Sequence, residues 1–176
     1  MSRELFAAPR TDPPESSIRS VKTGARSAGI LLYRYRDGEL QVLLVHMGGP
    51  FWATKDEGAW TIPKGEYGAA EQPLQAAQRE FLEETGAPVS GPFIELEPIR
   101  QRNGKVVSAW AAQGDFDPAQ LRSNLFSMQW PPRSGMMQQF PEADRAAWFT
   151  LSEAGSKMLS GQAALLAQLA QRLNSP

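Results

Sequence analysis

The chain has 176 residues, with 18 lysines and arginines, 19 aspartates and glutamates, one histidine and no cysteine. This length predicts one globular domain with a short appendage, and the absence of cysteine excludes disulfides, thiolate metal sites and cysteine nucleophiles. The net charge of -1 argues against a stable nucleic-acid complex, because such affinity comes from many basic contacts to phosphates.

The N-terminal part of the sequence predicts an arm followed by a hairpin. Residues 1–26 contain three prolines and show no helical or strand periodicity, so we expect a flexible arm there and one domain over residues 27–176. Apolar runs follow at residues 28–35 and 40–47, and an Asp-Gly pair lies between them. That pair favours a tight reversal, which predicts a β-hairpin.

The sequence also predicts where the protein is found. No apolar run approaches the roughly 18 residues that a membrane-spanning helix needs. The first residues lack the apolar stretch of a signal peptide. We therefore expect no membrane partner, a cytoplasmic location, and a monomer or homodimer.

The middle of the chain predicts a loop, a short strand and a helix. Residues 48–58 have loop composition, and residues 59–62 form a candidate strand. Residues 73–85 have helical spacing, with Pro73 suited to the first turn and Gly86 suited to the C-terminal cap.

The second half predicts another hairpin and then an irregular segment. Residues 93–101 and 106–113 have strand character and are joined by a turn-like Arg-Asn-Gly-Lys sequence. Residues 114–144 are rich in Pro, Gly, Ser and Asn, which predicts an irregular functional loop rather than a regular element.

The C-terminal part predicts a strand and an amphipathic helix. A short strand is expected at residues 147–149, followed by Ser152 as a helix N-cap. Leucines recur at helical spacing over residues 162–173. The order of elements is rich in strands with inserted helices, which predicts an α+β domain or a mixed sandwich.

Chemical groups concentrate on the predicted helix at residues 73–85. A helix advances about 100° per residue, so Glu80, Glu83 and Glu84 gather on one side and Phe81 on another. Like charges on one face cost roughly 0.2–0.5 kcal/mol per pair, so a compensating positive charge is expected. A solvated surface face is the alternative interpretation, because charge runs are usually exposed to water.

The loop before this helix favours a binding site over a solvated face. The segment Pro63-Lys64-Gly65-Glu66-Tyr67-Gly68 can bring main-chain carbonyls and a lysine close to the carboxylates. Hard oxygen ligands suit Mg²⁺ or Mn²⁺, which keep several waters and recruit phosphate oxygens for the rest of their shell. The pattern therefore predicts a site that handles phosphate.

From Gly65 onward the sequence resembles the signature box of the Nudix hydrolases. Five residues separate Gly65 from Glu71, and seven more precede the run Arg79-Glu80-Phe81-Leu82-Glu83-Glu84-Thr85-Gly86-Ala87. Every fixed glycine, glutamate and arginine has the family's spacing, which makes this motif far more specific than a short glycine pattern. Phe81 and Ala87 stand where the family prefers aliphatic residues, and we expect these changes to affect packing rather than chemistry.

This resemblance implies a fold, a reaction and a set of ligands. The fold is the α+β Nudix fold, a mixed β-sheet sandwiched between helices. The reaction is hydrolysis of a nucleoside diphosphate linked to another group, with Mg²⁺ or Mn²⁺. By the same resemblance Glu83 and Glu84 are metal ligands, Glu80 is a ligand or the base that activates water, and the Gly65 carbonyl is a further ligand.

The resemblance also implies groups around the metal ligands. Arg79 and Glu71 are similar to the pair that orients the family's glutamates. Family members often take a further metal ligand or base from a loop before a late strand, and Glu142 stands at such a position. Asp144 is the runner-up, and a surface carboxylate in a flexible loop is the plain alternative. The choice between Glu80 and Glu142 as general base stays open.

Side chains outside the box are candidates for substrate contact. Lys64 lies in a lead-in similar to that of Nudix enzymes acting on dinucleoside polyphosphates, and its compact charge suits a terminal phosphate. Arg133, in a Pro-Pro-Arg-Ser-Gly loop, is a candidate for another phosphate. Trp52 and Trp130 lie in predicted loops and are candidates to stack on a base. His46 ends a predicted strand and is a candidate contact, although single histidines are more often structural.

Together these observations predict a metal-dependent pyrophosphohydrolase with a small-molecule nucleotide substrate. A dinucleoside polyphosphate or a nucleoside triphosphate is the expected substrate, and nucleotide sugars are an alternative. A hypothesis of another class is a Nudix-fold domain that binds nucleotides for regulation without turnover. The intact glutamate set argues against it, because such modules often lose those carboxylates.

Overall fold

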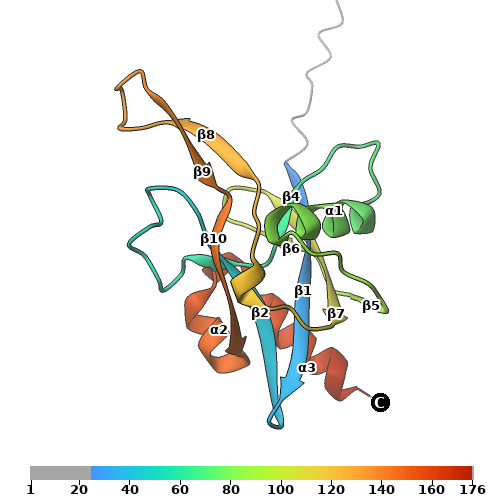
Figure 1. The fold of residues 1–176 in the computed structure, drawn as a ribbon. Coiled ribbons are helices and arrows are strands. Elements are labelled where there is room, and N and C mark those ends of the chain that lie inside the picture. Colours follow the sequence, from blue (N-terminus) through green and yellow to red (C-terminus); the bar gives the residue numbers. More distant parts are fainter. Residues whose placement is uncertain (1–24, 176) are drawn as a thin grey trace, which may run out of the picture.

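The computed structural model describes residues 25–175 and shows a mixed sheet between helices (Figure 1). The sheet has eight strands, and its main path runs in the order β10-β2-β1-β7-β5. Strand β1 (Arg26–Arg36) is central, antiparallel to β2 (Glu39–Met47) and parallel to β7 (Val106–Gln113). Most of the predicted arm lies outside the described residues, and its last residue, Arg26, already belongs to β1.

The apolar run of β1 divides between the two faces of the sheet. Leu32 packs in the cluster covered by α1 (Pro73–Thr85), whereas Leu31 packs in the cluster covered by α2 (Leu151–Lys157) and α3 (Ala164–Asn174). Successive side chains of a strand point to opposite faces, so a strand covered on both sides is apolar throughout. Figure 1 shows α1 on one face and the other two helices on the opposite face. The predicted α+β sandwich is confirmed.

Helix α1 begins and ends where the sequence predicts. Pro73 takes the first turn, where an N–H has no helical partner. Gly86 follows the helix with a φ of 81°, and its N–H donates to the Leu82 carbonyl at 2.8 Å. This left-handed conformation favours glycine and stops the helix.

Short strands hold the segment before α1 against the sheet. Strand β3 (Trp60–Thr61) lies within the strand predicted at 59–62 and pairs with β2. Strand β4 (Lys64–Glu66), which the sequence did not predict, pairs antiparallel with β1. A side chain on Gly29 of β1 would overlap β4 and the residue before it, so glycine is needed for this close approach. The loop backbone is therefore fixed beside α1.

The second predicted hairpin forms, but its first strand is interrupted. Strands β5 (Phe93–Glu95) and β6 (Ile99–Arg100) replace the continuous strand predicted at 93–101, and both pair with β7. Pro98 lies in the gap and has no N–H to donate to a ladder. The turn closes with a 2.8 Å hydrogen bond from the Gln101 N–H to the Lys105 carbonyl.

The irregular loop predicted at residues 114–144 is wrong. After the 3₁₀ turn η1 (Pro118–Gln120), strands β8 (Leu125–Gln129) and β9 (Met137–Pro141) form a separate two-stranded hairpin. Residues 114–124 are irregular apart from η1, and Pro131, Pro132, Ser134 and Gly135 occupy the turn of this hairpin. Strand β10 (Ala143–Thr150) is longer than the predicted strand at 147–149, because it pairs along β2 to Met47.

The C-terminal helices differ from the prediction at their starts. Ser152 is not the N-cap: Thr150 accepts from the Glu153 N–H, and the Glu153 carboxylate accepts from the Thr150 N–H, so α2 starts two residues earlier than predicted. The predicted helix at 162–173 becomes a 3₁₀ turn, η2 (Ser160–Gln162), followed by α3. No helix among residues 25–175 is long and apolar enough to cross a membrane.

Candidate active site

The acidic face of α1, formed by Glu80, Glu83 and Glu84, lies against the backbone of β4. A side chain on Gly65 would overlap the Glu80 carboxylate, so only glycine allows this approach. The N–H of Lys64 donates to Oε2 of Glu84 at 3.2 Å. The helix and the strand before it therefore bring two carboxylates and a stretch of main chain together.

Arg79 holds this face from its exposed side. Its guanidinium donates to both carboxylate oxygens of Glu71, at 2.8 and 3.0 Å, and its Nη1 donates to Glu80 at 2.6 Å and to Glu83 at 3.2 Å. The hydrogen bonds to Glu71, followed by those to Glu80, raise the pKa of Arg79 further above its usual range. One permanent cation thus compensates the like charges that share the helix face.

Burial shapes the charges at the centre of the site. It raises the pKa of Glu84 to about 8, against the opposing effects of the Lys64 ammonium and N–H. Burial also raises the pKa of Glu80, although the hydrogen bond from Arg79 opposes the change. Burial lowers the pKa of Lys64, and the nearby Lys105 charge adds to that effect. The raised pKa of Glu80 and of Glu84 indicates a site that favours additional positive charge.

Glu142 reaches this site from the junction between β9 and β10. Its N–H donates to the Asn124 carbonyl at 2.9 Å, and the Asn124 N–H donates to the main-chain carbonyl of Glu83 at 2.9 Å. The negative charge of Glu142 also contributes to the raised pKa of Glu80 and Glu84. The structure therefore brings Glu142 to the acidic face.

The side chains of Asp144 and His46 interact with each other rather than with the acidic face. Nδ1 of His46 lies 2.7 Å from the Asp144 carboxylate, and Nε2 lies 2.7 Å from the carbonyl of Lys55. The His46 side chain is fully buried and stands edge to face with Trp60. Both ring nitrogens are used within the protein, so the prediction of substrate contact by His46 is corrected to a structural role.

The remaining predicted contacts lie on segments other than α1 and β4. Trp130 and Arg133 are in the turn of the β8–β9 hairpin, which stands out from the sheet in Figure 1. Trp52 packs against the core and lies 4.7 Å from the Lys55 ammonium, so its ring faces are partly used. Phe51, which the sequence analysis did not select, is 56% exposed beside Trp130. Its place in a Gly-Gly-Pro loop was the only sequence signal.

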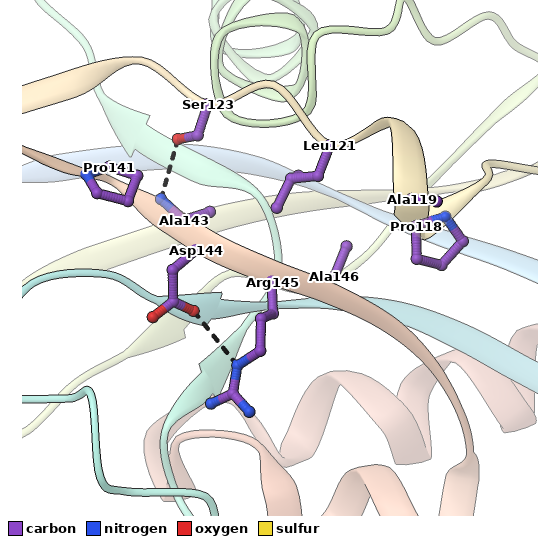
Figure 2. A pocket seen from close by; sticks show the side chains of 9 residues that line it. All are labelled: Pro118, Ala119, Leu121, Ser123, Pro141, Ala143, Asp144, Arg145 and Ala146. Atoms are coloured by element: carbon purple, nitrogen blue, oxygen red, sulfur yellow. Dashed lines mark hydrogen bonds and ion pairs between the residues drawn. The ribbon is translucent and has the colours of Figure 1, made fainter.

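A pocket of about 380 Å³ opens near Glu142, between the segment at 118–123 and the start of β10 (Figure 2). The Ser123 hydroxyl accepts from the Ala143 N–H at 2.9 Å, and Asp144 pairs with Arg145 at 3.5 Å. None of the acidic-face glutamates lines this pocket. It adjoins the candidate site without containing the groups for phosphate chemistry.

The donor set fits a hard divalent cation. Within residues 25–175 no three Asp, Glu, His or Cys side chains already converge as a metal site, and Arg79 occupies oxygens of Glu80 and Glu83. The nearby donors are nevertheless oxygen atoms, with the Glu80 carboxylate held directly against the Gly65 backbone. Such oxygen donors suit Mg²⁺ or Mn²⁺. Glu80, Glu83, Glu84, Glu142 and the Gly65 carbonyl are the groups that would hold it.

Comparisons with known proteins agree with this geometry. A family model described as "NUDIX domain" matches residues 24–170. A solved Ap4A hydrolase of C. elegans, in a binary complex, has 22% identity, a TM-score of 0.58, and coverage of 84% of this chain and 97% of that one. The NUDIX domain of Shewanella oneidensis NrtR, complexed with ADP ribose, has 19% identity, a TM-score of 0.61, and coverage of 91% and 95%.

Two further results limit the conclusions that follow from these structural similarities. One solved structure comes from a study of MutT from Aliivibrio salmonicida and Vibrio cholerae. Its chain has 14% identity and a TM-score of 0.51, with coverage of 84% of this chain and 96% of that one. A comparison with curated proteins finds no match. At these identities the solved structures show the fold alone.

Proposed function

The chain belongs to the NUDIX domain family, and we propose that it is a hydrolase of pyrophosphate bonds that cleaves a nucleotide with a polyphosphate chain, using Mg²⁺ or Mn²⁺. The expected substrates are a dinucleoside polyphosphate or a nucleoside triphosphate. The observation that carries this proposal is the contact of Glu80 with the Gly65 backbone, inside a cluster of carboxylates bracketed by Arg79.

Each part of the cluster has a proposed role. When bound, the cation would neutralise charge on the phosphate oxygens. Glu80 or Glu142 would take the proton of the attacking water, a contribution of about 10²–10⁴-fold in rate. Arg79, held by Glu71, would keep Glu80 and Glu83 in position.

The substrate phosphates also need positive side chains. Lys64, on β4, interacts through its charge with Glu84 and Glu80, so its ammonium is a candidate for binding a substrate phosphate. Burial lowers its pKa, so an arriving phosphate would favour its charged form. Arg133 and Trp130, on the hairpin turn, are proposed to contact parts of the substrate beyond the reacting phosphates.

A nucleotide panel tests this proposal. Phosphate-containing products should form from at least one member in the presence of Mg²⁺ or Mn²⁺ and not after chelation. Glu83→Gln and Glu84→Gln should each reduce kcat by at least about 100-fold if these carboxylates hold the cation. Wild-type rates in both folded variants would disprove the metal role.

The same panel separates catalysis from regulation by binding. If the wild-type chain binds nucleotides in a calorimeter but turns over no member of the panel, the domain is a nucleotide sensor. The complete set of glutamates, with an arginine that positions them, supports the hydrolase.

A further inference from the structure

Two surface segments leave the neighbourhood of Glu142 and meet again at two aromatic side chains, the exposed Phe51 and the half-buried Trp130. The N–H of Gly48, at the start of the loop at residues 48–58, donates to the Glu142 carbonyl at 2.9 Å. Strand β9 ends one residue before Glu142. At the outer end, the rings of Phe51 and Trp130 stand edge to face with centroids 5.3 Å apart. We call Phe51 and Trp130 the aromatic pair.

The two segments that carry the aromatic pair, the loop at residues 48–58 and the β8–β9 hairpin, pack against each other. Figure 1 shows the β8–β9 hairpin standing out from the sheet beside the teal loop that follows β2. A side chain on Gly49 would lie 2.9 Å from the ring of Phe126, so the loop backbone is in close contact with the hairpin. The φ of 90° at Gly49 likewise favours glycine at this contact.

The rest of the loop is tied firmly to the body of the protein. Its side-chain contacts include His46 Nε2 with the Lys55 carbonyl at 2.7 Å and the Trp60 indole N–H with Asp56 at 2.9 Å. Lys157 donates both to Asp56 and, at 2.7 Å, to Glu57. Phe51, by contrast, presents more than half of its surface to solvent. An exposed aromatic side chain on a rigid support loses little entropy on binding, so the aromatic pair is preorganised for a ligand.

The position of the pair indicates which part of a substrate it would meet. Phe51 is three residues from Gly48, so the two Cα atoms are at most about 11 Å apart. Glu142, bonded to Gly48, is in turn linked to the acidic face through Asn124, which accepts from the Glu142 N–H and donates to the Glu83 carbonyl, both at 2.9 Å. The aromatic pair therefore lies at the outer end of two segments that start beside Glu142, and a substrate that extends from the acidic face past Glu142 would meet it.

We propose that the aromatic pair stacks on the distal base of a dinucleoside polyphosphate, an inference that rests on the proposed function. Every nucleobase has a flat π face that aromatic side chains bind without reading its identity. Arg133, exposed in the same turn as Trp130, adds a positive charge for the phosphates that lead to this base. A nucleoside triphosphate has no second base, so the pair gives a preference for the longer substrate.

The test compares diadenosine tetraphosphate with adenosine tetraphosphate, which has the same phosphates and no second base. The measured quantity is the ratio of kcat/KM for the two substrates. Phe51→Ala and Trp130→Ala should each lower this ratio about 5- to 150-fold, the range for one base–aromatic stack. Phe51→Trp, which keeps a ring in place, should retain the ratio.

Met137→Ala is the matched control, because it removes a side chain that is 65% exposed on the same hairpin. Its ratio should equal that of the wild-type chain. An unchanged ratio in Phe51→Ala and Trp130→Ala would overturn the distal-base site, and so would a fall of the same size in Met137→Ala. If the wild-type chain cleaves other nucleotides of the panel but neither tetraphosphate, only the distal-base site fails. If it cleaves no nucleotide with Mg²⁺ or Mn²⁺, the proposed function itself fails, so the two failures are distinguished.

Discussion

The carboxylate of Glu80 lies against the backbone of Gly65, in the space that any side chain at position 65 would occupy. Arg79 holds the same carboxylate from the other side with a 2.6 Å hydrogen bond. The Glu80 side chain is largely removed from water, with 7% of the residue exposed. This contact joins the helix to the loop before it, and the candidate metal site depends on both.

Gly65→Ala should disrupt this contact. The added methyl group would displace Glu80, and we expect the free energy of unfolding to fall by about 1–3 kcal/mol, as for other overpacked sites. Activity should fall as well, because the carboxylate moves. Urea unfolding and steady-state kinetics measure both effects. Gly68→Ala is the control, since a side chain there meets nothing within 4 Å; equal behaviour of the two variants would contradict the interpretation.

Metal binding should depend on pH through Glu84. Burial raises the pKa of this carboxyl from 4.5 to about 8 in the folded chain. A cation must displace that proton, so Mg²⁺ affinity should rise as much as tenfold per pH unit below about pH 8 and level off above it. Calorimetric titrations between about pH 6 and 9 measure this slope. Glu39→Gln, in the first hairpin, is the control and should keep this slope. A Mg²⁺ affinity of the wild-type chain that does not change with pH would contradict the role given to Glu84.

The same proton links pH to the stability of the metal-free protein. Between pH 4.5 and about 8 the folded chain holds a proton on Glu84 that the unfolded chain has released. The unfolded state thus binds fewer protons, and this group lowers the free energy of unfolding as pH rises through that window. Urea unfolding at several pH values should show that the Glu84→Gln variant loses part of this decline. An identical pH dependence in the variant would refute the assignment.

Glu142 and Asp144 should differ in their effect on catalysis. Glu142 faces the acidic cluster, so Glu142→Gln should lower kcat about 10²–10⁴-fold if it is the general base. Asp144 is paired with His46 and Arg145, so Asp144→Asn should lower kcat less than about tenfold. Rates at saturating Mg²⁺ provide the comparison. The reverse order would identify Asp144 as the functional carboxylate.

His46 should matter for stability rather than for substrate binding. His46→Leu would leave the Asp144 carboxylate and the Lys55 carbonyl without their partner. Because water can reach Asp144, we expect the free energy of unfolding to fall by about 1 kcal/mol for each lost hydrogen bond. The KM of the folded variant should stay within about twofold of the wild-type value. Unfolding curves and KM values decide the point: a large rise in KM with unchanged stability would restore the predicted substrate contact.

Features set by neighbouring residues could be predicted from the sequence. The spacing of Glu80, Glu83 and Glu84 places them on one side of any helix, and the helix limits follow from Pro73 and Gly86. The hairpin over β1 and β2 is equally local, because a turn-forming pair lies between two apolar runs. Residues 114–144 were mispredicted because turn-forming residues marked the tip of a hairpin, which composition does not distinguish from a loop.

The amino-acid sequence by itself determined the acidic helix, its glycine-bearing lead-in and the apolar pattern of a sheet covered on both faces, because each depends on spacings of a few residues. Only the tertiary structure decided that Glu142 joins this helix, that Asp144 turns to His46, and that Phe51 rather than Trp52 meets Trp130. These pairs are distant in the chain, and which of two neighbouring side chains makes the contact depends on how strands and loops pack against each other.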